Sequence, residues 1–121
     1  MTPRRGPQFK LIETQPVGGA IVARLIGPSI LQDSELEAVG QQLGELVARG
    51  VKRVALDMGA LAAMSTGLLT KLLTFQATLK AAGGRLALFS VPPQIYEIFE
   101  VTRLNTKFNL YVTEFEALES F

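Results

Sequence analysis

The chain contains 121 residues, of which 48% are hydrophobic and 19% are charged, and its net charge is +1. This length and composition predict one globular domain with its own core, and they argue against a disordered chain or two independent domains. The balanced charge gives no general attraction to nucleic acid. Cysteine and histidine are both absent, which excludes disulfides, thiol nucleophiles and imidazole as a general base or metal ligand.

The hydropathy pattern contains no targeting or membrane signal. The first residues lack the apolar segment of a secretion signal, and no apolar run reaches the roughly 18 residues that a membrane span needs. We therefore expect a cytoplasmic protein with no direct membrane insertion. Residues 1–7 contain two prolines and a glycine and are expected to form a flexible tail before a single domain at 8–121.

The first predicted elements are a hairpin and a helix. Strands are expected at residues 9–14 and 20–25, with a turn at 16–19. The next segment begins with Ser34 and Glu37, which have the spacing of a capping box at a helix start. Its apolar residues then recur every three or four positions and predict one buried stripe, formed by Leu36, Val39, Leu43 and Leu46.

In the second half, strands and helices alternate. Short apolar strands are predicted at 53–57, 85–89 and 108–112, the first of them in the centre of the sheet. A long helix follows the first strand, with a buried stripe formed by Leu68, Leu72, Phe75 and Leu79. Pro92 and Pro93 begin a third helix, and a second capping box at 113–116 begins a short last one.

The element order ββαβαβαβα predicts the fold class. Alternation of strands and helices favours parallel strands with right-handed crossovers, whereas the first hairpin must be antiparallel. We therefore predict an α/β fold with a mixed β-sheet, an N-terminal hairpin and helices mainly on one face.

The sequence lacks the common motifs of nucleotide-dependent and hydrolytic enzymes. The chain has no Walker A sequence, no G-x-G-x-x-G after the early strands and no G-x-S-x-G. Asp57 ends a strand as a phospho-acceptor aspartate would, but no acidic pair accompanies it to hold a divalent ion. We therefore expect no enzyme activity, no cofactor and no metal site.

One segment stands out, where a predicted strand has ended and the long helix begins. It reads Met64-Ser65-Thr66-Gly67-Leu68-Leu69. A helix N-terminus carries unpaired N–H groups and a partial positive charge, so it tolerates a phosphate. The hydroxyl pair is therefore open to two interpretations: Ser65 or Thr66 only caps the helix, or one of them is a regulatory phosphorylation site.

These motifs, in their order and spacing, resemble the STAS domain family, the fold of anti-sigma-factor antagonists. The family has a strand that ends in V-x-L-D, followed by D-S-[ST]-G-L at a helix start. In this chain the corresponding residues are 54–57 and 64–68. The helix that follows ends at Gly83-Gly84, before the next strand. Further downstream, the family pattern is matched by Phe99, Thr102, Leu104, Phe108, Thr113, Glu116, Ala117 and Leu118.

The resemblance implies a function for the segment. In this family a partner kinase phosphorylates the second hydroxyl, which corresponds to Thr66, with Ser65 the less favoured acceptor. The implied partner-binding residues are Met64, Ser65, Thr66, Gly67 and Leu68. The implied partners are an anti-sigma factor that is a serine-threonine kinase of the histidine-kinase-like ATPase type, and a phosphatase.

The chain departs from the family pattern at two places. Met64 replaces the acidic residue before the hydroxyl pair, and the family's early G-x-L-D turn is replaced by residues 27–30, which contain no acidic residue. An alternative function therefore stays open: a non-phosphorylated STAS interaction subunit of a transport or signalling complex.

Overall fold

The structure is a computed structural model and describes residues 11–26 and 33–121. Its five strands are β1 (Ile12–Val17), β2 (Ala20–Leu25), β3 (Arg53–Asp57), β4 (Arg85–Phe89) and β5 (Asn109–Tyr111). Its helices are α1 (Asp33–Ala48), α2 (Thr66–Ala81), α3 (Pro93–Val101), the short 3-10 helix η1 (Leu104–Thr106) and α4 (Glu114–Glu119). The tail predicted at residues 1–7 and the departure at 27–30 lie outside the described residues.

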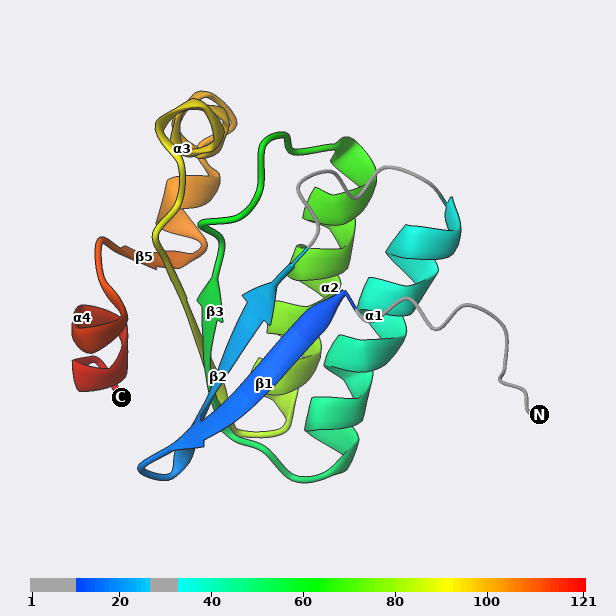
Figure 1. Cartoon of the computed structure of the whole chain (residues 1–121), viewed down its shortest axis with the longest axis vertical. Helices are drawn as coiled ribbons and strands as arrows, with labels where there is room; N and C mark the ends of the chain where they lie inside the picture. The colour runs from blue at the N-terminus through cyan, green and yellow to red at the C-terminus, as the bar shows by residue number, and fades with distance from the viewer. Residues whose placement is uncertain (1–10, 27–32) are drawn as a thin grey trace.

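The strands form a single sheet in the order β1-β2-β3-β4-β5. β1 and β2 are antiparallel, whereas β2, β3, β4 and β5 are parallel to their neighbours. The long helices α1 and α2 cover one face of the sheet, and the short α4 lies on the other (Figure 1). The predicted mixed α/β fold, with a hairpin at one edge and β3 in the centre, is confirmed.

The hairpin turn differs from the prediction. Val17 pairs with Ala20, so the turn contains only Gly18 and Gly19, whose φ angles are +51° and +85°. A tight hairpin turn of this kind needs left-handed backbone at both central residues, which glycine adopts without steric cost. The strand therefore continues through Pro16, which is tolerated because β1 lies at the sheet edge. The predicted bounds of 9–14 were wrong at the C-terminal end, and residues 9 and 10 lie outside the described residues.

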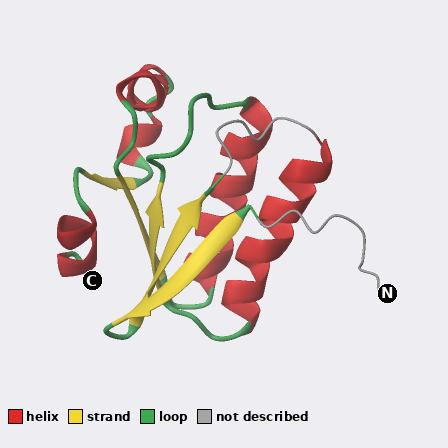
Figure 2. Ribbon diagram, in the orientation of Figure 1, coloured by secondary structure: helices red, strands yellow, loops and turns green. Residues whose placement is uncertain are grey.

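The two faces of the sheet are packed differently because side chains alternate along each strand. Val54, Leu56, Leu86 and Leu88 belong to the main core, together with the buried stripes of α1 and α2. On the opposite face, Ala55 and Ala87 pack with Ala117 of α4 in a second, smaller cluster. Figure 2 shows the corresponding layers, with two long helices on one side of the strands and one short helix on the other.

The two predicted capping boxes have different outcomes. At α4 the Thr113 hydroxyl accepts the N–H of Glu116 at 3.2 Å, and the Glu116 carboxylate accepts the N–H of Val112 at 3.1 Å. α1, however, already begins at Asp33, so Ser34 lies inside its first turn and is not the cap as predicted. The residue before Asp33 lies outside the described residues.

Candidate functional site at the start of helix α2

The loop from β3 to α2 is tied to the sheet at its first residues. The N–H of Met58 donates to the carbonyl of Phe89 at 3.0 Å, and the Met58 side chain is fully buried. Asp57 accepts the N–H of Gly59 with one carboxylate oxygen at 2.8 Å and the Arg24 guanidinium with the other at 3.2 Å. These contacts hold the loop against β2 and β4, so the segment that leads to α2 starts from a defined position.

Asp57 therefore has a structural explanation. Both of its oxygens have partners from the neighbouring backbone and β2, so its place at a strand end does not require a phosphoryl or metal ligand. Among residues 11–26 and 33–121, no group of three acidic side chains is arranged to hold a metal ion.

The structure distinguishes the roles of the two hydroxyls. Ser65 is the N-cap of α2: its backbone is extended, and its side-chain oxygen accepts the N–H of Leu68 at 3.0 Å. Thr66 is the first helical residue, and it is exposed. The structure thus shows which of the two hydroxyls caps the helix: the cap is Ser65, and the hydroxyl of Thr66 is not needed for that purpose.

The remaining predicted site residues are not equally accessible. Met64 is half-buried and packs against the main core. Leu68 is 0% exposed, so its side chain is not available to a partner in the way that the resemblance implied. Its side chain is the first of the inward stripe of α2, which continues to Leu72, Phe75 and Leu79.

Gly67 allows α1 and α2 to approach each other closely. A Cβ built on Gly67 would lie 2.5 Å from the Cδ1 of Leu36 in α1. Any larger side chain would therefore have to displace Leu36. Of the five predicted contact residues, Met64, Ser65 and Thr66 are the ones placed to offer side-chain atoms to a partner, whereas Gly67 and Leu68 support the helix start.

The helix start is suited to an added negative charge. The first turn of α2 contains no acidic residue, so a phosphate there would meet no like charge on its own turn. The first N–H groups of a helix have no partner within it, and the helix dipole gives this end partial positive charge. The N–H of Leu68 donates to the side-chain oxygen of Ser65. The N–H groups of Thr66 and Gly67 lie at the first two positions of the helix.

A hollow that the sequence did not reveal lies next to the loop. It has a volume of about 670 Å³ and is lined by Gly59 of the loop, by residues after β4 and by the end of β5. Tyr96 of α3 and Val112 contribute apolar atoms to it and are 39% and 75% exposed. The predicted order of strands could have indicated this hollow, because the carboxyl ends of parallel strands meet at one edge of a sheet and commonly form such a crevice.

The fold and the capped, hydroxyl-bearing helix start define an anti-sigma-factor-antagonist-like domain. The chain belongs to the STAS domain family, since the family model described as "Mlab, STAS domain" matches residues 29–113. Within the described residues, no helix is both long enough and apolar enough to cross a membrane.

Individual proteins of the family support the same assignment. The chain is 29% identical over 86 residues to BtrV of Bordetella bronchiseptica, which bears the name of an anti-sigma factor antagonist, and the match covers 71% of this chain and 72% of BtrV.

Two solved structures resemble the fold. An anti-sigma factor antagonist structure from Thermotoga maritima superposes with a TM-score of 0.80 at 18% identity, over 93% of this chain and 96% of that one. The phosphorylated form of SpoIIAA from Bacillus superposes with a TM-score of 0.68 at 22% identity, over 90% and 97%.

Proposed function

We propose that the chain is a non-enzymatic, cytoplasmic interaction module that binds an anti-sigma factor when unmodified and releases it when Thr66 is phosphorylated. The observation that carries this proposal is the position of Thr66: it is exposed at the first residue of α2, beside a cap that does not depend on its hydroxyl. The modifying enzyme would be a serine-threonine kinase of the histidine-kinase-like ATPase type, and a phosphatase would reverse the reaction.

The packing favours Thr66 over Ser65 as the acceptor. Ser65 is half-buried and its side-chain oxygen accepts the N–H of Leu68, so a kinase acting on it would have to disturb the cap. Losing such a cap costs about 1 kcal/mol. Thr66 can be modified without that cost, because α2 keeps its cap.

A phosphate on Thr66 would change the surface more than the fold. It adds a charge of about −1.5 to −2 at neutral pH, together with three strong hydrogen-bond acceptors. The partial positive charge of the helix start would accommodate this group. A partner seated over Met64, Ser65 and Thr66 would instead face a bulky dianion in the middle of its contact surface, and its affinity would fall.

Phosphorylation and binding can be tested with matched variants. The purified chain is incubated with its cognate kinase and ATP, and modified residues are located by mass spectrometry. Binding of the anti-sigma factor is then measured by calorimetry for Thr66→Glu and for Thr78→Glu, an exposed threonine on the same helix about 18 Å further along. The proposal expects phosphate on Thr66 and weakened binding for Thr66→Glu, with no change for Thr78→Glu.

A second function is favoured by Met64. A half-buried apolar side chain, where the family has an acidic residue, suits a permanent protein contact in a transport or signalling complex. Such a static subunit would carry no phosphate on Ser65 or Thr66 under conditions where the kinase is active. Met64→Asp would then weaken its complex, whereas in the phosphorylated module the same change would leave binding intact and promote modification.

A further inference from the structure

The hollow beside Gly59 is an uncharged surface at the carboxyl ends of the strands. The described residues that line it come from the β3–α2 loop, from residues 90–96 and from the end of β5 with Val112, and none of them is acidic or basic. Tyr96 and Val112 present side-chain atoms to solvent there, since they are 39% and 75% exposed. Its volume of about 670 Å³ lies within the range of sites that enclose a ligand, so an aromatic side chain would fit.

The backbone around the hollow is held in place. Ser90 has a φ angle of +56°, a conformation that is uncommon for a residue other than glycine and that clusters at binding sites. Two prolines follow at 92 and 93, and their rings fix φ. A Cβ built on Gly59 would lie 3.4 Å from the Cβ of Ser90, so the two loops are in close contact. A partner would therefore bind a surface that is already ordered, which lowers the entropy cost of binding.

The rim of the hollow is acidic. Residues 90–102 and 108–121, which supply its α3 and β5 walls, contain glutamates but no lysine or arginine. Residues four apart on a helix are neighbours, so Glu100 lies beside Tyr96 on α3. The carboxylate of Glu116 accepts the N–H of Val112 at 3.1 Å. The glutamates of these two segments are Glu97, Glu100, Glu114, Glu116 and Glu119.

The rim carries its negative charge without basic partners. Between described residues, ion pairs join only Arg24 to Glu13 and Asp57. The nearest basic residues in the sequence, Arg103 and Lys107, flank η1 and do not line the hollow. An uncharged hollow with an acidic rim is therefore complementary to an apolar side chain with positive charges around it.

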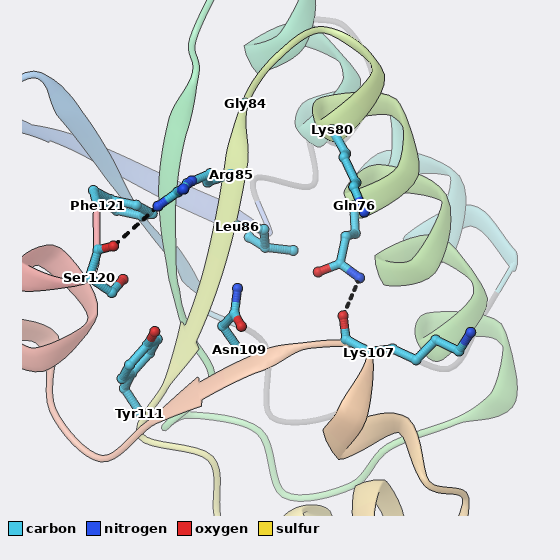
Figure 3. Close-up of a pocket in the computed structure, with 10 residues that line it drawn as sticks. All are labelled: Gln76, Lys80, Gly84, Arg85, Leu86, Lys107, Asn109, Tyr111, Ser120 and Phe121. Carbon is cyan, nitrogen blue, oxygen red and sulfur yellow. Dashed lines mark hydrogen bonds between the residues drawn. The ribbon is translucent and has the colours of Figure 1, made fainter.

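The C-terminal end of α2 has the opposite character. A hollow of about 540 Å³ is lined there by Lys80, Arg85 and Lys107, and the described part of its lining contains no acidic residue (Figure 3). Figure 3 shows these cations on both sides of β4, with Arg85 on one side and Lys80 next to Gln76 on the other. This hollow would repel a basic segment, so of the two hollows only the one beside Gly59 suits such a segment.

The acidic rim argues against other occupants. A second copy of the chain seated on the same surface would bring two acidic rims together, because a twofold contact uses the same patch on both subunits. Nucleic acid and an anionic membrane carry negative charge and would also be repelled. A basic segment of a different protein meets neither obstacle.

We propose that this hollow docks a basic segment of a partner protein, in which an aromatic side chain is flanked by arginines or lysines. The aromatic side chain enters the hollow and contacts Tyr96 and Val112, while the flanking cations lie against Glu97 and Glu100. The surface is separate from the proposed phosphorylation site, because Thr66 does not line the hollow. Docking there goes beyond the proposed switch and requires neither the kinase nor the phosphate.

The probe is a capped peptide with a central tryptophan flanked by two arginines on each side. The chain contains no tryptophan, so the fluorescence anisotropy of the peptide reports binding without background from the protein. We expect a Kd of about 0.1–1 mM, which weakens as salt is added. A peptide with glutamates in place of the arginines should not bind. A peptide with alanine in place of the tryptophan should compete at least about tenfold more weakly, since aromatic anchors dominate such contacts.

Matched valine variants test the hollow itself. Val112 and Val101 are 75% and 78% exposed, but only Val112 lines the hollow. Val112→Ser should weaken peptide binding about fivefold, because apolar contact is lost, whereas Val101→Ser should leave the affinity unchanged. NMR of a ¹⁵N-labelled sample of the whole chain should show peptide-induced shifts at the amides of Gly59, Val91 and Val112. Circular dichroism confirms that each variant is folded.

Matched glutamate variants test the rim. Replacing Glu97 and Glu100 together with glutamine should weaken binding about threefold and reduce its salt dependence, because two exposed attractions are removed. Replacing Glu37 and Glu45 with glutamine removes the same charge from exposed positions on α1, outside the hollow, and should have no effect.

Four outcomes would overturn the proposal. They are the absence of saturable peptide binding, equal binding of the glutamate peptide, unchanged affinity in a folded Val112→Ser variant, and peptide-induced shifts confined to residues outside the hollow. Sedimentation of the chain without peptide covers the remaining occupant. A dimer that Val112→Ser dissociates would make this surface an interface between copies and would also contradict the proposal. None of these results depends on phosphorylation of Thr66, so the proposed switch stands or fails separately.

Discussion

Replacing Ser65 with alanine tests the assignment of the two hydroxyls directly. The change removes the oxygen that accepts the Leu68 N–H at 3.0 Å and leaves that donor without its partner. Loss of a serine cap costs about 1 kcal/mol, within a range of about 0.5–2. Thr66→Ala should instead be nearly neutral or slightly stabilising, because Thr66 is exposed within the helix and alanine is the best helix former.

The expected shift in melting temperature follows from the size of the domain. Globular proteins gain about 2.1 cal/mol/K of entropy per residue on unfolding, which for 121 residues amounts to roughly 0.25 kcal/mol/K. A loss of about 1 kcal/mol therefore lowers the melting temperature by about 4 °C. Thermal unfolding followed by circular dichroism resolves such a shift, and urea unfolding gives an independent free energy.

A third variant separates capping from the hydroxyl itself. Ser65→Asp replaces one good capping residue with another, and its negative charge suits the helix start, so it should unfold close to the wild type. The reasoning would be refuted if Thr66→Ala lost as much stability as Ser65→Ala, or if Ser65→Asp were as unstable as Ser65→Ala. Either result would mean that Ser65 is not the cap.

Other substitutions test the packing around the site and the loop. Leu68→Ala should lower the free energy of unfolding by about 2–5 kcal/mol in urea, and Leu68→Lys should prevent folding, because the side chain is 0% exposed. A Cβ on Gly84 would lie 2.6 Å from a backbone oxygen, whereas one on Gly44 would meet nothing within 4 Å. Gly84→Ala should therefore destabilise the domain. Gly44→Ala should stabilise it by about 0.5–1 kcal/mol, because alanine has the higher helix propensity. Equal melting temperatures for the two variants would contradict this reasoning. Asp57→Ala should cost about 1–2 kcal/mol because a loop N–H loses its acceptor, whereas Arg24→Ala should cost less than about 1 kcal/mol because the partly exposed ion pair is weak. Equal losses for the two variants would show that the ion pair, which both changes remove, and not the loop contact, accounts for the contribution of Asp57.

The elements that sequence patterns located best are those with the strongest local signals. The strands at Ala20–Leu25, Arg53–Asp57 and Arg85–Phe89 have the predicted bounds, because each is a short apolar run. The bounds of β1 were less predictable, since a hairpin register depends on the turn. Two consecutive glycines at 18 and 19 permit a turn of two residues, and this moves the end of the strand to Val17.

At the candidate site, the helical period was the more reliable guide. Leu68 was predicted both as the first residue of a buried stripe and as a partner contact, and these two roles conflict for one side chain. The structure places it in the core, as the spacing of four to Leu72 requires. Whether Ser65 or Thr66 is the cap could not be decided locally, because both residue types can cap a helix and they are adjacent.

The hollow lined by Gln76, Lys80, Arg85 and Lys107 could not be predicted from local patterns. It depends on where β5 begins relative to β4, which is a matter of register between strands more than 20 residues apart in the chain. The three basic residues that line it come from α2, β4 and the segment before β5. Nothing in their sequence spacing brings them together; the fold of the sheet corner does.

The length of α2 has a consequence for communication across the domain. Thr66 and Lys80 lie at opposite ends of this helix of 16 residues, about 21 Å apart along its axis. At physiological ionic strength, charges are screened over about 8 Å, so a phosphate on Thr66 would hardly change the electrostatic potential at Lys80 through solvent. The α2 backbone and its buried stripe connect the two places in one continuous piece. A small rigid shift of the helix against the sheet is therefore the direct route by which a change at one end would reach the other.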